Sequence, residues 1–545
     1  MRAALAILIA VAAALPVEAA RLSDVKRAKA YVAEVAKHLT ESFIDRDKVD
    51  KAALERAGLK GLEAAPDHKD FAGLEAETRA ALRDALKGKE SAAAALDAAA
   101  GVIGEEKFDW LKLADHATRA MVKHVNDPFA RILTKEEFNK LLKMLQGGQK
   151  EDSIGIAVQP AEKGFAVAYV QYGYVAYDEG IEMGDEISAI NGAAVAGKSP
   201  EDVNEQLKLK PGESIALTVR RPGHKDAYEF KLVQRKTRSQ DVHHAMLGDG
   251  VGYLRMTMFD LNLQSAVKKA LKAMKEKGMT SIILDVRHNP GGALPASTSV
   301  ADLFLPQNLL ITKVEMSYKP QMFGFEIPGM GGDQEYRTKS KSEFEEMPMR
   351  VLINHASASA SELLSGALQD HKRAKLIGET TYGKGVGQSP ILLSSAGGGL
   401  MAPERCLYLT VLRYYLPTGR SINHRGVAPD MEFAAKKAAP EKFAAAWKVR
   451  TSKQLAEWLD ANWAGHKEAL AGLAEYDRYE TAGYPGFDAL FASLKTTLTK
   501  DEVRGEVRRA VRARLKAEDG TNWVHDLQTD VQLQCALVDI LDSRK

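Results

Sequence analysis

The sequence contains very little cysteine, and its positive and negative charges nearly balance. Only Cys406 and Cys535 occur among 545 residues, so a fold held together by several disulfides is excluded. Whether these two cysteines pair in an oxidising compartment stays open. They have no clustered histidines at zinc-ligand spacing, so no metal site is predicted. The formal net charge of +2, with both signs interspersed, argues against binding to nucleic acid or to an anionic membrane.

Long apolar runs are also rare, with one exception at the beginning. Residues 1–20 read MRAALAILIAVAAALPVEAA, in which Arg2 precedes an uncharged stretch too short to span a bilayer and small residues follow at 17–19. This pattern is typical of a secretory signal peptide. We therefore expect an exported protein, periplasmic or secreted, without stable membrane insertion.

The pattern of apolar and polar residues changes along the chain, which indicates several domains. Residues 21–150 are helical in pattern, and residues 151–236 alternate like short strands between Gly, Pro and Asp turns. In residues 237–435, continuous apolar strands such as SIILDV, MRVLIN and AKLIG alternate with helices, as in an α/β core. Residues 436–545 are helical again. The predicted fold class is multidomain α+β.

Three local features carry more specific expectations. Thr134, with Glu137 three residues later, predicts a helix start. Residues 313–348, which contain Met, Gly and Pro, are expected to form a loop or lid rather than a core element. The basic face of VRGEVRRAVRARLKAEDG is expected to be solvated, with partner or membrane binding as a minority interpretation.

Three segments of the α/β region could carry chemistry. They are DVRHNPGG at 285–292, HASASASE at 355–362 and YGKGVGQ at 382–388. Each follows a predicted strand, and sites in open α/β sheets form outside the carboxyl ends of the strands. The three segments could therefore meet at one edge of the sheet.

The third segment overlaps G-x-x-x-x-G-K, most of a nucleotide-binding P-loop. That motif needs Ser or Thr after the lysine to ligate Mg²⁺, and Gly385 stands there instead. Nucleotide binding is therefore a remote alternative, and a solvated lysine is the ordinary one. A third interpretation makes Lys384 a base, because burial disfavours the ammonium form of lysine.

The run of Ser and Ala at 356–361 predicts a helix start, where a serine could be a simple N-cap or a nucleophile. A nucleophile needs a base, and His288, His355, His371 and Lys384 are the candidates. No G-x-S-x-G elbow surrounds any serine here. Gly383 and Gly385 would let the lysine loop approach closely, and Gln388 could hold the amine. The Asn-Pro-Gly-Gly turn could supply N–H groups to an oxyanion, or could be an ordinary turn.

Taken together, the three segments resemble the C-terminal processing peptidase (tail-specific protease) family, whose core carries an NPGG-like turn, an S-A-S-A-S-E helix start and a G-K-G-x-x-Q loop. The resemblance implies Ser359 as nucleophile, Lys384 as base and Gln388 as its partner. It further implies an oxyanion hole from Gly291 or Gly292 and Ala360, with Asp370 and Glu362 in support. Ser357 and Ser361 then become neighbours of the nucleophile.

The resemblance extends from about residue 115 to 430. SIGIAV and IEMGDEISAINGAAV resemble a PDZ domain, whose carboxylate-binding loop would comprise Ser153, Ile154, Gly155 and Ile156. The family implies a crotonase/ClpP-like α/β protease core with this PDZ domain inserted. Two departures are His288, where Asn is usual, and residues 175–180, which are irregular for a PDZ domain.

The sequence thus predicts an exported serine endopeptidase that captures unstructured C-terminal tails and cleaves with a Ser–Lys dyad, without metal, nucleotide or other cofactor. The terminal helices could bind a second copy or an adaptor. Two alternatives stay open. One is a catalytically silent PDZ scaffold that only binds peptides. The other is a hydrolase in which His355 or His371 serves Ser359.

Overall fold

A computed structural model describes residues 23–544 except 105–107, 148–152, 236–240, 320, 323–324, 327–330, 400–401, 435–437 and 522. The signal-peptide prediction falls on residues 1–20, outside the described residues. The chain divides into two compact units, and each is described by itself. Unit 1 comprises residues 1–147, 308–337 and 384–424, and unit 2 comprises residues 148–307, 338–383 and 425–545.

Unit 1 begins with amphipathic helices that pack against one another. Buried Tyr31 on α2 donates a hydrogen bond to Asp115 on α6 (2.9 Å), which also pairs with Arg405. Thr134 caps α7 with Glu137 in a capping box, which confirms that prediction. The helices are α2 (Asp24–Glu41), α3 (Lys51–Ala64), α4 (Ala76–Leu86), α5 (Ala92–Ile103), α6 (Trp110–His124) and α7 (Lys135–Leu145), with short turns η2 (Arg46–Lys48), η3 (Ala65–Asp67) and η4 (Lys69–Phe71).

The sheet of unit 1 has the order β1-β20-β11-β14, with β17 also paired to β20. The expectation of a loop over residues 313–348 is wrong in part, because β11 lies inside this sheet and β14 at its edge. Leu310–Met316 buries Ile311, Thr312 and Val314 and has a register shift between Leu310 and Thr312, so it lacks the strict alternation that marks a strand in the sequence. The strands are β1 (Arg131–Thr134), β11 (Leu310–Met316), β14 (Gln334–Arg337), β17 (Val386–Leu392) and β20 (Arg405–Tyr415), beside the short pairs β12 (Gln321–Met322) with β13 (Phe325–Glu326) and β18 (Gly398–Gly399) with β19 (Ala402–Pro403).

Unit 2 contains the α/β layer that the apolar runs predicted. Its sheet has the order β21-β16-β15-β10-β9-β8, parallel except for the antiparallel β8–β9 pair. The strands are β8 (Val242–Met246), β9 (Val251–Met256), β10 (Ser281–Asp285), β15 (Met349–Ile353), β16 (Lys375–Gly378) and β21 (Met431–Glu432). β9, β10 and β15 are buried throughout, as expected for strands covered on both faces.

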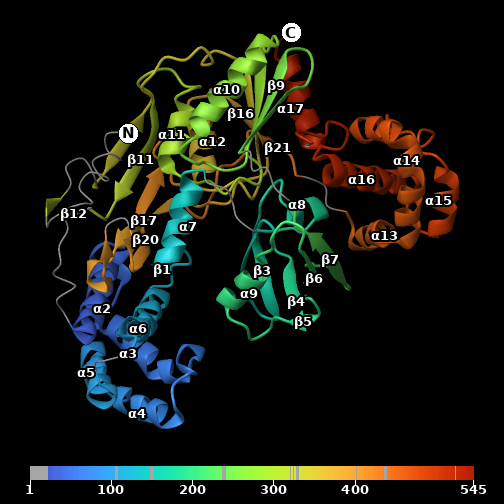
Figure 1. The fold of residues 1–545 in the computed structure, drawn as a ribbon. Coiled ribbons are helices and arrows are strands. Elements are labelled where there is room, and N and C mark those ends of the chain that lie inside the picture. Colours follow the sequence, from blue (N-terminus) through green and yellow to red (C-terminus); the bar gives the residue numbers. More distant parts are fainter. Residues whose placement is uncertain are drawn as a thin grey trace. The chain divides into compact units, whose positions relative to one another are not determined.

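Helices supply the cover. They are α10 (Leu263–Glu276), α11 (Leu294–Ala301), α12 (Ala360–Asp370) and the C-terminal α17 (Val531–Asp542). Leu533, Ala536 and Ile540 of α17 join a core cluster with alternate residues of the sheet, including Tyr253 and Ile283. α17 packs against β15, β10 and β16, and Figure 1 shows α10, α11 and α12 grouped together.

Replacing Leu533 with alanine is expected to lower the free energy of unfolding by about 2–5 kcal/mol, because it leaves a cavity between α17 and the sheet. Val538→Ala is the matched control on the same helix, since Val538 is 58% exposed, and should change stability by no more than about 0.5 kcal/mol. Chemical denaturation monitored by circular dichroism measures both. Equal effects of the two variants would contradict the packing of α17.

A small β domain precedes this layer in unit 2. Its sheet has the order β2-β3-β4-β6-β7, with β5 paired to β4, so β2 lies at an edge. The strands are β2 (Ile156–Ala161), β3 (Gly164–Val170), β4 (Glu186–Ile190), β5 (Ala193–Ala194), β6 (Ser214–Arg220) and β7 (Ala227–Val233), with helices α8 (Val175–Glu179) and α9 (Pro200–Gln206). Residues 175–180, irregular in sequence, form α8 and its left-handed cap Gly180.

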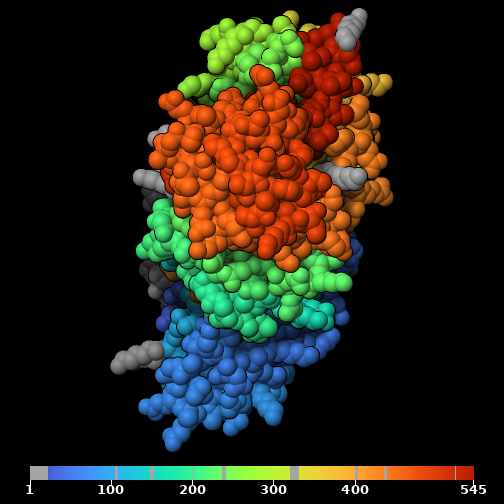
Figure 2. All heavy atoms as spheres, turned by 90° about the vertical axis from the view of Figure 1, so that its right-hand side faces the viewer, coloured from blue at the N-terminus to red at the C-terminus, as the bar shows by residue number. Residues whose placement is uncertain are grey.

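The C-terminal helices of unit 2 pack on this β domain. Phe443 and Trp447 join its core, with Trp447 4.4 Å from Phe230 between ring centroids. Figure 2 shows these helices, in orange and red, adjoining the green β domain. The helices are α13 (Pro440–Arg450), α14 (Lys453–Glu475), α15 (Phe487–Leu494) and α16 (Lys500–Asp519).

The expectation that the basic face of α16 is solvated is wrong. Arg504 and Arg508 are buried and pair with Asp477 and Asp526 respectively. Arg509 donates to the Asp178 carbonyl oxygen of the small β domain at 2.8 Å. Helical periodicity located these arginines on one face, but their acidic partners are distant in sequence and could not be read from it.

Within the part of the chain that the structure describes, no helix has the length and apolar character that crossing a membrane requires. Cys406 on β20 and Cys535 on α17 are both free thiols. Burial raises the pKa of Cys406 to about 12, so this thiol is protonated at neutral pH.

Candidate active site

Asp285, at the carboxyl end of β10, anchors the segment that follows. It is fully buried between Arg255 and Arg287 and accepts a hydrogen bond from Tyr253 at 2.6 Å. Burial alone would raise the pKa of Asp285, but the two arginines outweigh it and hold the pKa well below its usual range. Arg287 also pairs with Asp530, the N-cap of α17. The predicted turn therefore follows a strand end at which buried ion pairs neutralise the charge of Asp285.

The turn at 288–292 lies directly against the start of α12. Its glycine Gly291 has φ of 97°, and a Cβ there would stand 2.8 Å from the Ala360 nitrogen and 2.9 Å from the Ser359 Cβ. Only glycine permits this approach. The Gly291 N–H is donated to Asn289 Oδ1 at 2.9 Å, whereas no hydrogen bond among the described residues uses the N–H of Gly292 or Ala360. Gly292 is thus a better candidate than Gly291 to donate its N–H to an oxyanion.

Ser359 lies immediately before α12 in a strained conformation. Its φ is 55° and its ψ is −113°, a region that residues with a side chain rarely adopt. Its side chain stands at a helix N-terminus, where unpaired N–H groups and the helix dipole favour negative charge. Because no G-x-S-x-G motif surrounds Ser359, the sequence did not predict this strained backbone conformation.

The flanking serines explain the alternating motif. Ser357 Oγ donates to the Val286 carbonyl oxygen at 2.8 Å, and Ser361 Oγ donates to that of Asn289 at 2.9 Å. The Ala358 N–H also donates to Asn289, at 3.0 Å. These bonds fasten the α12 start to the turn on both sides of Ser359, and they use the hydroxyls of Ser357 and Ser361 as structural donors.

Glu362 fixes the backbone around Ser359. This fully buried carboxylate accepts hydrogen bonds from the Ser359 N–H (2.7 Å), the Thr381 hydroxyl (2.5 Å) and the Gly383 N–H (2.7 Å). A carboxylate with several donors is a strong acceptor. Through Glu362 the helix start is tied to the residue that directly precedes Lys384 in the chain.

Lys384 and Gln388 belong to unit 1, whereas Ser359 belongs to unit 2. Lys384 is half-buried, donates to Gln388 Oε1 at 3.0 Å and has its Nζ 4.3 Å from the centre of the Phe129 ring. Gln388 Nε2 in turn donates to Thr410 on β20 at 3.0 Å. The predicted pairing of the lysine with the glutamine is therefore present in unit 1.

Three residues named by the sequence lie away from Ser359 or face other partners. Asp370 ends α12 and His371 caps it, so the helix rise places them about 15 Å along the axis from Ala360. His355 is half exposed and pairs with Glu379 at 3.2 Å. No hydrogen bond between His355 and Ser359 occurs among the described residues. The structure thus gives neither histidine a position as base.

The predicted peptide-binding loop has a fixed backbone. Gln234 donates to the Ser153 carbonyl oxygen at 2.8 Å, the Gly155 N–H donates to Ser153 Oγ at 3.0 Å, and Ala176 donates to Ile154 at 3.1 Å. Ile156 begins β2, the edge strand of the small sheet. An edge strand has unpaired backbone groups that an added peptide strand can bond.

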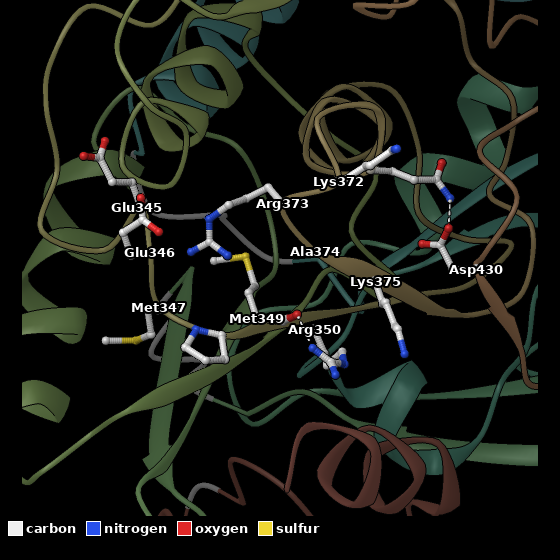
Figure 3. A pocket seen from close by; sticks show the side chains of 12 residues that line it. Glu345, Glu346, Met347, Met349, Arg350, Lys372, Arg373, Ala374, Lys375 and Asp430 are labelled. Carbon is white, nitrogen blue, oxygen red and sulfur yellow. Dashed lines mark hydrogen bonds between the residues drawn. The ribbon is translucent and has the colours of Figure 1, made fainter. Parts of the chain in front are cut away.

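A surface cavity of about 540 Å³ lies at the other end of the parallel strands of unit 2. It is lined by Met349 and Lys375, the first residues of β15 and β16, together with Arg350 and Arg373 (Figure 3). The turn at 288–292 and the start of α12 follow the carboxyl ends of strands. This cavity is therefore separate from the candidate site.

His288 provides a pH-dependent test of the turn. Burial lowers the pKa of His288 to about 3, helped by the charges of Arg255, Arg287 and His355 and opposed by Asp285. Among the described residues its Nδ1 has no hydrogen-bond partner. Below pH 6.5 the unfolded chain takes up a proton that the folded chain does not, so this histidine lowers stability progressively as the pH falls from about 6.5 towards 3.

We therefore expect His288→Asn to flatten the pH dependence of stability below pH 6.5, by up to about 1.4 kcal/mol per pH unit. At pH 7.5 the variant should lose about 1 kcal/mol with the His288 Nε2–Asn354 hydrogen bond, but no backbone strain is added, because Asn tolerates the positive φ of 57° at this position. Thermal unfolding between pH 5 and 7.5 measures both effects. Parallel pH profiles of variant and wild type would show that His288 is not buried in its neutral form.

Sequence and structure comparisons agree with this geometry. Residues 250–433 match peptidase family S41 and residues 153–232 match the PDZ domain. A carboxyl-terminal-processing protease of Picosynechococcus is 31% identical over 326 residues, 59% of this chain and 73% of that protein. One from Synechocystis is 29% identical over 318 residues, 58% and 69% of the two chains. The solved photosystem II D1 C-terminal processing protease shares the fold with a TM-score of 0.50, 23% identity and coverage of 75% of this chain and 93% of that one.

Fold and comparisons together define a serine-type endopeptidase that carries a PDZ domain and acts on peptide substrates. The chain belongs to peptidase family S41, among the carboxyl-terminal-processing proteases.

Proposed function

We propose that this protease cleaves with a dyad of Ser359 and Lys384, and that its PDZ domain captures unstructured C-terminal tails. The observation that carries the proposal is the contact between the Gly291 turn and the strained start of α12. It supports an oxyanion hole made from the N–H groups of Ala360 and of Gly292 or Gly291.

In this mechanism Ser359 Oγ attacks the scissile carbonyl carbon while the neutral amine of Lys384 accepts the hydroxyl proton. The carbonyl π electrons move to the oxygen, which the N–H groups stabilise. Collapse breaks the C–N bond, and Lys384 returns its proton to the leaving amine. Water, activated by the same lysine, then hydrolyses the acyl-enzyme. The Gln388 bond supports the role of Lys384 by directing its N–H towards an acceptor, while Glu362 holds the Ser359 backbone.

The same proposal covers how the tail binds, the fold of the core, the domain limits, export and assembly. The tail would add as a strand to β2, with its carboxylate at Ser153, Ile154, Gly155 and Ile156. The α/β region would be a crotonase/ClpP-like core, and the domain limits would be 1–20, 21–150, 151–236, 237–435 and 436–545. Residues 1–20 would direct export. The terminal helical regions, outside both family matches, would be where a second copy or an adaptor binds.

The test measures both the reactivity of Ser359 and the binding of a C-terminal tail. A serine-reactive fluorophosphonate is expected to label Ser359, identified by peptide mass spectrometry. A folded reporter with an unstructured C-terminal tail should be cleaved, and amidation of the tail should raise KM because the carboxylate is lost. A chain that binds the tail but neither labels nor cleaves would be the catalytically silent PDZ scaffold.

A further inference from the structure

The N-terminal helical region gathers three metal-ligand side chains that the catalytic segments do not use. His68, Asp70 and His116 offer one nitrogen or oxygen atom each, and these atoms lie within 4.8 Å of one another. His68 Nδ1 and His116 Nε2 are each 3.1 Å from Asp70 Oδ2. His68 and His116 are 48 residues apart in sequence, so their spacing did not predict the cluster.

Two short helical turns and helix α6 position these three residues. Pro66 lies within the turn η3, His68 separates η3 from η4, and Asp70 lies within η4. His116 lies on α6, where α3 crosses so closely that a Cβ on Gly61 would stand 2.2 Å from the His116 carbonyl oxygen. The buried Phe71 packs beside the His116 ring, with centroids 5.6 Å apart. The turn and the helix are therefore locked together around the cluster.

The donor atoms fit one class of cation. Zinc bonds imidazole nitrogen and carboxylate oxygen at about 2.0–2.2 Å in tetrahedral geometry, so its donor atoms lie about 3.3 Å apart. The two 3.1 Å separations are close to that value, and all three donor atoms lie within 4.8 Å. His68 Nδ1 also accepts the Asp70 N–H at 3.2 Å, a hydrogen bond that a bound metal would replace. Two imidazoles and one carboxylate suit zinc and neighbouring transition metals rather than Ca²⁺ or Mg²⁺, which take mostly oxygen.

The cluster combines two imidazoles with a single carboxylate, so it brings at most one negative charge. Lys112 and Arg119 add positive charge nearby. The cluster is therefore no general acidic patch, and binding has to rest on coordinate bonds.

We propose that His68, Asp70 and His116 form a three-residue binding site for a zinc-like divalent transition metal, with the fourth position open to water. The ion would join the η3–η4 turn to α6 and stabilise the N-terminal helical region. The ordinary alternative is two hydrogen bonds that need no metal: the Asp70 N–H donates to His68 Nδ1, and Asp70 Oδ2 bonds His116 Nε2.

The test uses the full chain without a histidine tag, stripped with a chelator and titrated with ZnCl₂, with CoCl₂ as a spectroscopic probe. We expect one Zn²⁺ per chain, a tetrahedral Co²⁺ visible spectrum and a higher unfolding temperature with Zn²⁺. His68→Gln, Asp70→Asn and His116→Gln should each weaken Zn²⁺ binding by at least about 100-fold. His124→Gln, at the exposed end of the same helix α6, should bind like wild type.

Asp70→Asn preserves the shape of the side chain, so it decides the matter if a histidine variant fails to fold. Wild-type protein that binds no Zn²⁺ would overturn the proposal. Binding that survives unchanged in Asp70→Asn would overturn it as well. Tighter binding of Ca²⁺ than of Zn²⁺ would show that coordination chemistry does not define the site.

Discussion

Ser359→Ala is expected to abolish peptide-bond cleavage, lowering kcat/KM by about 10⁴- to 10⁶-fold. The variant removes the one oxygen that attacks the substrate in the proposed mechanism, and the residual rate would come from binding and the oxyanion hole. Its fold should persist, because the Ser359 N–H and the hydroxyls of Ser357 and Ser361 still fasten the start of α12. Single-turnover cleavage of a tailed peptide, with circular dichroism as the folding control, measures the effect.

Ser365→Ala is the matched control. Ser365 lies on the same helix, is fully buried and donates its hydroxyl back to the Ser361 carbonyl oxygen at 2.7 Å. Its loss should leave kcat/KM within a few-fold of wild type, at a cost of about 1 kcal/mol in stability. If Ser359→Ala retained activity while Ser365→Ala lost it, the nucleophile would be misassigned. A tailed substrate retained uncleaved by Ser359→Ala would also identify what the PDZ domain captures.

The parallel layer of unit 2 was readable from the sequence because its strands are short, mainly apolar runs. SIILD and MRVLI were predicted as strands covered on both faces, and they are β10 and β15. The helix start at residues 356–361 followed from its small residues. β11 escaped prediction because its buried residues do not alternate strictly and because a Gly- and Pro-containing stretch follows it.

The candidate site was predicted as a set of residues rather than as a geometry. The family resemblance selected Ser359 and the Gly291 turn, but nothing in it indicated that Ser359 has a positive φ or that Glu362 accepts three donors. These properties arise from contacts between segments 20 to 70 residues apart. Likewise, the pairing of Arg508 with Asp526 reversed the expectation of a solvated basic helix.

Lys384 offers a sharper test of the reaction than its removal alone. Lys384→Met keeps an apolar chain of similar length against Phe129 but has no amine, so kcat/KM should fall by at least about 10³-fold. Lys272→Met, on the exposed side of α10, is the matched control and should be fully active. A Lys384→Met variant with wild-type activity would eliminate the dyad, whatever the outcome at Ser359.

Lys384→Arg separates a base from a cation. Arginine keeps a positive charge near Phe129 and can still donate to Gln388 Oε1, but its guanidinium does not lose a proton in proteins. If Lys384 acts as the general base, the arginine variant should be as inactive as the methionine variant at every pH from 6 to 9. If Lys384 only stabilises negative charge, the arginine variant should recover much of the activity. Recovery by arginine would therefore contradict proton transfer by Lys384 and require another base for Ser359.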